Sequence, residues 1–122
     1  MLNLDTHVLL FALDGSLTRQ EEALVSSDRW GISAIVLWEI AKLHQLGRIE
    51  RGLEDPVLQE RLKHVRIWSV DLQVAYALLR LDFRSDPADE LIAATSIAHN
   101  VPMVTRDTKL LASSVVPFAL MP

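Results

Sequence analysis

The 122-residue sequence contains no cysteine, which excludes disulfide frameworks, zinc–thiolate sites and cysteine nucleophiles and fits a reducing cytoplasm. Glycine and proline are scarce, with 4 and 5 residues, so a collagenous or disordered chain is excluded. No apolar run approaches the roughly 18 residues of a membrane span. No basic residue precedes Arg19, so the charged start of a signal peptide is missing. We expect a cytoplasmic protein with no membrane partner.

An excess of positive charge is missing too. The chain has 12 Lys and Arg residues against 16 Asp and Glu residues, a formal net charge of −4. A polyanion such as nucleic acid would therefore need a local basic patch or a bridging metal to bind. Apolar residues, in contrast, make up 50% of the chain. A chain of this length buries enough surface for one core, so we expect one domain over residues 1–122.

Strand-like and helix-like segments alternate along the sequence. The patterns predict strands at residues 2–5, 30–33, 65–70, 103–105 and 115–118. They predict helices at residues 6–13, 18–27, 34–46, 56–64, 72–81, 86–99 and 108–112. This alternation is typical of an α/β fold, in which right-handed crossovers join parallel strands and helices cover both faces of the sheet. In such folds the chemistry gathers at the carboxyl ends of the strands.

Three aspartates stand where an ordinary helix cap would also explain them. Asp5 and Asp107 each follow a predicted strand and directly precede a helix, and aspartate is a preferred N-cap. Asp89 lies three residues after Asp86, itself a natural cap before Pro87, and this is the spacing of a capping box. The same positions are strand ends or helix starts, where a catalytic or metal-binding role is the alternative to capping.

Glu39 has no capping role. Its neighbours Ile35 and Leu43, four residues away on either side, place its carboxylate on or beside the apolar face of a predicted helix. Burying an unpaired carboxylate is costly, so Glu39 needs a cation, a hydrogen-bond network or water, and Lys42 is the simplest structural partner. If these acids meet at one edge of the sheet, a hard divalent cation, Mg²⁺ or Mn²⁺, would relieve their repulsion.

Four segments of the sequence resemble the PIN-domain ribonucleases, and among them the VapC toxins of toxin–antitoxin pairs. In the family's order, the segments are residues 4–10 (LDTHVLL), 33–41 (SAIVLWEIA), 86–95 (DPADELIAAT) and 104–107 (VTRD). The resemblance implies a three-layer α/β/α fold with a central, mostly parallel sheet. It implies a Mg²⁺- or Mn²⁺-dependent endoribonuclease that hydrolyses RNA phosphodiester bonds. It also implies a homodimer and a small antitoxin protein as partner.

The resemblance further implies which residues form the catalytic and metal-binding site. The matching acidic quartet consists of Asp5, Glu39, Asp89 and Asp107. Three more candidates for supporting or substrate contacts are Thr105, Asp86 and Arg106. One position departs from the family pattern, because Glu90 follows the third acid where many relatives have arginine.

Other functions were compared with the ribonuclease. A receiver-like phosphoacceptor domain would carry paired acids after the first strand and a lysine at a late strand end, whereas Asp5 has no acidic neighbour and Lys109 falls in a predicted helix. A haloacid-dehalogenase-like phosphatase would have an aspartate at the position of His7. A catalytically inactive PIN-like module acting by partner binding remains as the alternative to the endoribonuclease.

Overall fold

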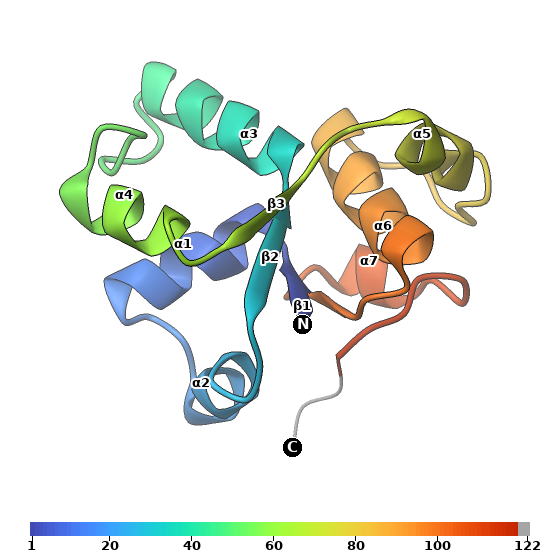
Figure 1. Ribbon diagram of the computed structural model, residues 1–122, viewed down its shortest axis with the longest axis horizontal. Coiled ribbons are helices and arrows are strands. Elements are labelled where there is room, and N and C mark those ends of the chain that lie inside the picture. The colour runs from blue at the N-terminus through green and yellow to red at the C-terminus, as the bar shows by residue number, and fades with distance from the viewer. Residues whose placement is uncertain (120–122) are drawn as a thin grey trace.

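A parallel sheet of four strands forms the centre of the computed structural model, which describes residues 1–119 (Figure 1). The strands are β1 (Leu2–Leu4), β2 (Trp30–Ser33), β3 (Arg66–Trp68) and β4 (Met103–Val104). They lie in the order β3-β2-β1-β4, with Asn3 of β1 opposite Gly31 on one side and Met103 on the other. Residues 120–122 of the expected domain lie outside the described residues.

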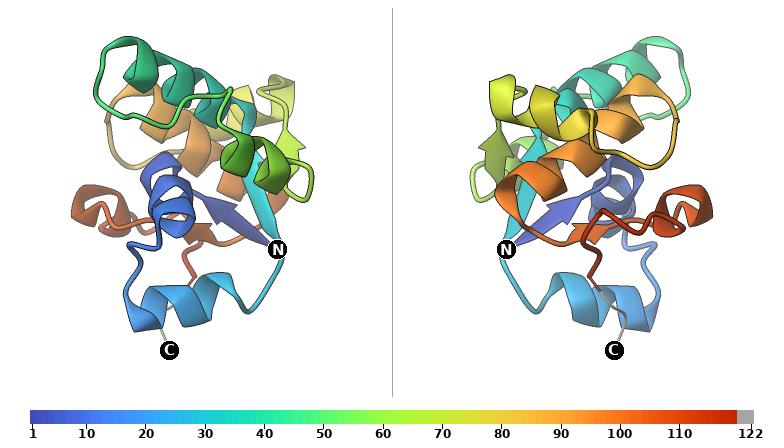
Figure 2. Two further views of the ribbon diagram at one scale, coloured as in Figure 1. Left: turned by 90° about the vertical axis from the view of Figure 1, so that its left-hand side faces the viewer. Right: turned by 90° about the vertical axis from the view of Figure 1, so that its right-hand side faces the viewer.

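Helices cover both faces of this sheet. They are α1 (Thr6–Asp14), α2 (Arg19–Val25), α3 (Ala34–Gln45), α4 (Pro56–Leu62), α5 (Leu72–Leu78), α6 (Pro87–His99) and α7 (Thr108–Leu111). In Figure 1, α1 and α4 lie on one side of the sheet and α5 and α6 on the other, which confirms the three-layer α/β/α architecture. Figure 2 shows α2 at the opposite end of the molecule from α3. Within residues 1–119, no helix is long and apolar enough to cross a membrane.

The strand predicted at residues 115–118 is wrong. Only Phe118 forms an isolated parallel bridge, with Met103. Met103 makes the two backbone hydrogen bonds of this bridge, with Pro117 and Ala119, while the preceding Ser114 donates its backbone N–H to Asp82 at 2.8 Å and forms no strand. Most other elements are slightly shorter than predicted; for example, β3 ends at Trp68 and α5 ends at Leu78. The exact first and last residues of an element are the least certain part of a prediction from sequence patterns.

The ring of Trp68 packs directly against the backbone of Gly31 in β2. A Cβ atom on Gly31 would lie 2.3 Å from the ring of Trp68, so only glycine fits there. On the other side of β1, the buried Asn3 donates hydrogen bonds from Nδ2 to the carbonyl of Ile92 at 2.9 Å and to Ser96 Oγ at 2.8 Å. These two bonds tie β1 to α6, and so they set the distance between residues at the end of β1 and those at the start of α6.

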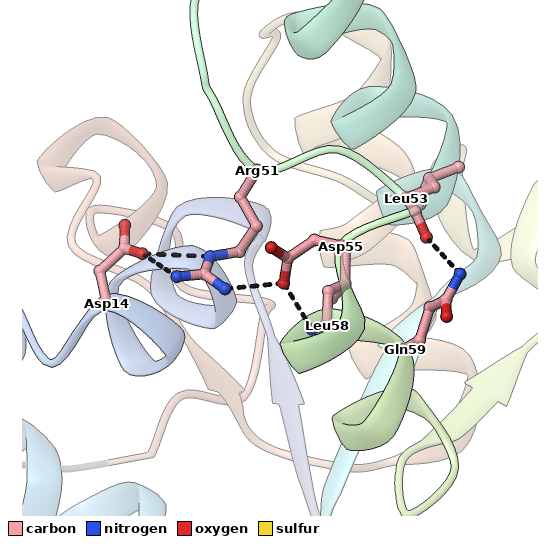
Figure 3. Close-up of polar contacts among 6 residues, drawn as sticks. All are labelled: Asp14, Arg51, Leu53, Asp55, Leu58 and Gln59. Atoms are coloured by element: carbon pink, nitrogen blue, oxygen red, sulfur yellow. Dashed lines mark hydrogen bonds and ion pairs between the residues drawn. The ribbon is translucent and has the colours of Figure 1, made fainter.

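An arginine bridge fixes α4 against α1 (Figure 3). Arg51 donates from Nη1 to Asp55 Oδ2 at 2.7 Å and from Nε to Asp14 Oδ1 at 3.2 Å. Asp55 is the N-cap of α4 and also accepts from the backbone N–H of Leu58 at 3.0 Å. The start of α4 is therefore anchored to the end of α1.

Candidate active site

Asp5 lies at the carboxyl end of β1 and is 6% exposed. Its Oδ1 accepts from the backbone N–H of Thr6 at 2.8 Å, and its Oδ2 accepts from the hydroxyl of Thr105 at 2.7 Å. Burial raises the pKa of Asp5, and the charges of Asp89 and Glu39 raise it further. The hydrogen bond from Thr105 lowers this pKa but does not cancel the rise. Asp5 therefore caps α1 with one oxygen and faces Thr105 and the other acids with the remaining one.

Glu39 is half-buried on α3 and accepts a hydrogen bond from the hydroxyl of Thr6. The expected pairing with Lys42 is wrong, because the Lys42 ammonium donates instead to Gln45 Oε1 at 2.8 Å. Since Thr6 also gives its backbone N–H to Asp5, this one threonine holds two acids of the predicted quartet. Glu39 is thus satisfied by a hydroxyl and not by a cation.

Asp89 lies in the first turn of α6, half-buried. The capping box expected with Asp86 is wrong, because the exposed Asp86 side chain makes no capping hydrogen bond. Asp89 Oδ2 instead accepts from Ser85 Oγ at 2.9 Å, while the Ser85 backbone N–H donates to Glu90 Oε2 at 3.1 Å. Burial raises the pKa of Asp89, the Ser85 hydroxyl opposes this rise, and the charges of Asp86 and Asp107 add to it. Asp86 acts on Asp89 only through its charge.

Asp107 is the N-cap of α7, as its position in the sequence predicts. Its Oδ1 accepts from the backbone N–H groups of Lys109 at 2.9 Å and Leu110 at 3.4 Å. Its own backbone N–H donates to Thr105 Oγ1 at 3.1 Å. Because the Thr105 hydroxyl also donates to Asp5, Thr105 is the polar link between Asp107 and Asp5.

Arg106 points away from these acids. Its guanidinium donates from Nε to Glu21 Oε2 at 2.7 Å and from Nη2 to Glu21 Oε1 at 2.6 Å. Nη2 also donates to the carbonyl of Ser16 at 3.1 Å, and the guanidinium lies 4.2 Å from the centre of the Phe11 ring. The Arg106 hydrogen bonds lower the pKa of Glu21 to about 2. The structure therefore places Arg106 in an ion pair and not beside the quartet.

Sequence analysis missed the hydroxyl donors of Thr6 and Ser85 and the carboxylate of Glu21. A signal existed for Glu21, because Thr18 and Glu21 have the spacing of a capping box, and both of its hydrogen bonds are present. The partner of the Thr6 hydroxyl, Glu39, lies 33 residues away and depends on how α1 and α3 pack, whereas Ser85 reaches Asp89 within its own segment, four residues along. Thr6 and Ser85 donate to acids of the predicted quartet, and Glu21 pairs with Arg106 instead.

We call Asp5, Glu39, Asp89 and Asp107 the acidic edge. Within residues 1–119, no lysine or arginine forms an ion pair with any of them. In the same range, no three His, Asp or Glu side chains are arranged to hold a metal ion. The donor chemistry nevertheless fits Mg²⁺ or Mn²⁺, because carboxylate oxygens are their preferred ligands and the charges lack a cation. Sharing one ion would require the side chains to turn toward each other.

A PIN-domain family model matches residues 3–113, nearly the whole chain. The chain belongs to the PIN-domain family. This PIN domain is 36% identical over 94 residues to Ribonuclease VapC22 of Mycobacterium tuberculosis, which covers 73% of this chain and 71% of that protein. The resemblance to PIN-domain ribonucleases of the VapC type is thereby confirmed.

Solved structures share the fold of this PIN domain. The crystal structure of FitAcB from Neisseria gonorrhoeae is 27% identical, with a TM-score of 0.70 over 98% of this chain and 97% of that one. VapBC2 from Rickettsia felis, bound to a DNA fragment from its promoter, has a TM-score of 0.69 over 100% of both chains. At 19% identity, this second likeness concerns the fold alone.

Proposed function

We propose that this PIN domain is the toxin of a type II toxin–antitoxin pair, a cytoplasmic, metal-dependent endoribonuclease that hydrolyses RNA phosphodiester bonds at the acidic edge. The observation that carries the proposal is that the buried Asp5 and the half-buried Asp89 both have raised pKa values and form no ion pair among the described residues. Perturbed acids grouped at strand ends are typical of catalytic sites. Similarity to a VapC ribonuclease supports the reaction class.

Mg²⁺ or Mn²⁺, when bound, supplies positive charge for the phosphate and activates a water molecule. We propose that Asp5 and Asp89 hold the ion directly and that Glu39 and Asp107 hold it directly or through water. Thr105 keeps Oδ2 of Asp5 oriented, and Ser85 does the same for Oδ2 of Asp89. Two backbone N–H groups donate hydrogen bonds to Asp107 and hold its carboxylate at the start of α7. Each acid is thus oriented by a neutral donor that leaves its negative charge in place.

An apolar groove between α1 and α4 supports a protein partner. The groove has a volume of about 570 Å³ and is lined by Ala12, Leu13, Trp30, Pro56, Val57, Glu60, Arg61 and His64. The Arg61 guanidinium lies 3.6 Å from the centre of the Trp30 ring, so the groove also contains a positive charge packed on an aromatic ring. Structures of VapBC and FitAB complexes are among those similar to this chain. We propose that a small antitoxin protein occupies this groove.

A second apolar surface supports the homodimer. Leu72, Tyr76 and Leu79 follow one another at helical spacing along α5 and its C-cap, and they are 62%, 56% and 79% exposed. Exposed apolar residues that share one helix face are typical of interfaces. We propose that two copies meet there, and a Tyr76→Glu variant that stays dimeric in light scattering would contradict this interface.

The test of the ribonuclease combines cleavage with metal binding. Wild type, Asp5→Asn and Asp89→Asn are compared for Mn²⁺-supported cleavage of a fluorogenic single-stranded RNA library and for melting temperature during Mn²⁺ and Mg²⁺ titration. Metal at 100 times its dissociation constant stabilises a fold by about 2.7 kcal/mol, so the wild type should melt higher with metal and the variants should not respond. The control is Asp28→Asn, because Asp28 pairs with the amino terminus at 2.6 Å, outside the acidic edge.

Two results would contradict the proposal. Undiminished cleavage by both site variants would show that the acidic edge is not the catalytic site. A wild type that binds no metal, while the variants melt higher because repulsion is relieved, would favour the inactive module that acts by partner binding. The Asp28→Asn control should behave like wild type in both cleavage and metal response.

A further inference from the structure

The Glu21–Arg106 ion pair joins two segments that are 85 residues apart in the sequence. On one side, Glu21 belongs to α2, at the end of the molecule away from α3 (Figure 2). On the other side, Arg106 lies between Thr105 and Asp107, the two residues that link α7 to Asp5. The ion pair is therefore the side-chain connection between α2 and the turn formed by residues 105–107.

Both partners of this pair are held in a single arrangement. The Glu21 side chain is 8% exposed, and its Oε1 also accepts from the backbone N–H of Thr18 at 2.8 Å. The Arg106 guanidinium makes two hydrogen bonds to Glu21, a third to the Ser16 carbonyl, and lies over Phe11. A bidentate arginine–carboxylate pair is directional as well as strong. An arginine so engaged is not free to reach a phosphate.

The turn that Arg106 anchors carries two groups of the site. The Thr105 hydroxyl accepts from the Asp107 backbone N–H at 3.1 Å and donates to Asp5 Oδ2 at 2.7 Å. In this turn the Thr105 hydroxyl points to Asp5, the Asp107 carboxylate caps α7, and the Arg106 side chain points to α2. Fixing Arg106 to α2 consequently fixes the backbone on which Thr105 and Asp107 stand.

We propose that the Glu21–Arg106 ion pair is a positioning device that holds the 105–107 turn so that Thr105 and Asp107 keep their places beside Asp5. In this proposal, which rests on the proposed ribonuclease function, Arg106 acts through the turn and makes no contact with RNA phosphate. Glu21 is then a residue that cleavage depends on although it lies outside the acidic edge.

A double-mutant cycle tests the proposal, using Glu21→Gln, Arg106→Gln and the double variant. Glutamine keeps an oxygen for the Thr18 cap, so Glu21→Gln preserves the start of α2 while removing the ion pair. We expect each single variant to lower kcat by about 10-fold or more with KM changed less than about 2-fold, as for partners that orient metal ligands. The double variant should be no worse than either single variant, because all three break the same contact.

A second readout needs neither metal nor substrate. The Asp107 backbone N–H donates to Thr105 within the turn, so its hydrogen exchange reports directly on the order of that turn. Exchange of this amide should accelerate in both single variants. The matched control is Arg51→Gln, which breaks a comparable arginine bridge between Asp14 and Asp55 (Figure 3) and should change neither the exchange of Asp107 nor kcat.

Three outcomes would overturn the positioning role. Arg106→Gln raising KM while Glu21→Gln cleaves like wild type would mean that Arg106 binds RNA phosphate directly. Unchanged exchange at Asp107 in both variants would mean that the pair does not hold the turn. Additive losses in the double variant would mean that the two residues act separately. Failure of the ribonuclease itself is distinguishable, because Asp5→Asn in the same assay would then cleave like wild type.

Discussion

At the acidic edge, Asp5 and Asp89 receive hydrogen bonds from hydroxyl and backbone groups, and burial raises both of their pKa values. Two carboxylates elsewhere in the molecule, Glu21 and Asp55, pair with arginines instead. Glu21 accepts two hydrogen bonds from Arg106, which lower its pKa to about 2. The pKa of Asp55 is also lowered, mainly by a hydrogen bond from the backbone N–H of Leu58 and further by the bond from Arg51 (Figure 3).

The difference shows how one residue type serves two purposes in a small fold. A carboxylate beside arginine stabilises the folded state, because its charged form is favoured there. Burial without a nearby cation disfavours the charged form of a carboxylate, and this lowers the stability of the folded state at neutral pH. Two such acids, close enough for the charge of Asp89 to raise the pKa of Asp5, support a role in binding a cation or in a reaction. The following predictions test this contrast.

The largest expected effect is the loss of cleavage in Asp5→Asn. Removing the charge while keeping the shape should lower kcat/KM by at least about 100-fold, the upper range for groups that only orient a metal ligand. Asp55→Asn makes the same chemical change at an arginine-paired acid and should leave cleavage per folded molecule unchanged. The measurement is RNA cleavage with active protein quantified by folded fraction. Equal losses in the two variants would erase the contrast.

The next effect concerns stability at Glu21. The Glu21 pKa of about 2 lies below its ordinary value of 4.5, so the ion pair stabilises the folded state fully above pH 4.5 and is lost as the pH falls toward 2. At pH 7, Glu21→Gln should lower the free energy of unfolding by about 1.5–3 kcal/mol, the range for a hydrogen bond to a charged group. Urea denaturation between pH 3 and 7 should show this difference shrinking below about pH 4.5. A stability difference between wild type and Glu21→Gln that stays constant with pH would mean that the charge of Glu21 does not contribute.

Asp5 should show the opposite pH dependence. A raised carboxyl pKa stabilises the fold below the ordinary value of 3.8 and loses this stabilisation as the pH rises through the folded-state value. In EDTA at pH 7, Asp5→Asn should therefore melt at a higher temperature than wild type, and the difference should vanish in acid. Asp28→Asn should instead melt lower at pH 7, since the amino terminus lowers the pKa of Asp28. A lower melting temperature for Asp5→Asn would refute the burial argument.

Much of the fold follows from local patterns in the sequence. Apolar alternation and the punctuation by Gly15, Gly47 and Pro87 predict the strands and helices, because each signal acts within a few residues. The strand expected at 115–118 is reduced to a single bridge at Phe118, and Asp82, more than 30 residues away, binds Ser113 and Ser114 just before it. A parallel sheet also brings strand ends together, which is why the acidic edge could be anticipated.

The partners of the site residues were less predictable. Arg106 stands next to Asp107, so its position favours a substrate contact, yet its side chain turns toward Glu21, 85 residues away. Asp86 stands at the position of a helix cap, but its side chain makes no capping hydrogen bond. Ser85 instead donates its backbone N–H to Glu90 and its hydroxyl to Asp89. The direction of the Arg106 side chain depends on where α2 lies in the fold, which spacing along one element does not encode, whereas Ser85, Asp89 and Glu90 make local contacts that compete with the capping box.

The smallest effect is expected for Ser85→Ala. The hydroxyl of Ser85 donates to Asp89 Oδ2 at 2.9 Å and opposes the rise of its pKa, whereas the backbone bond from Ser85 to Glu90 survives the substitution. Without the hydroxyl, the pKa of Asp89 should rise further, so the acid limb of the pH–rate profile should move to higher pH. The loss of kcat at pH 7 should stay below about 10-fold. Ser113→Ala is the matched control, because its hydroxyl donates to Asp82, an acid outside the acidic edge, and its pH–rate profile should coincide with that of wild type. A shift of the same size in both variants would mean that the profile reports general stability and not Asp89.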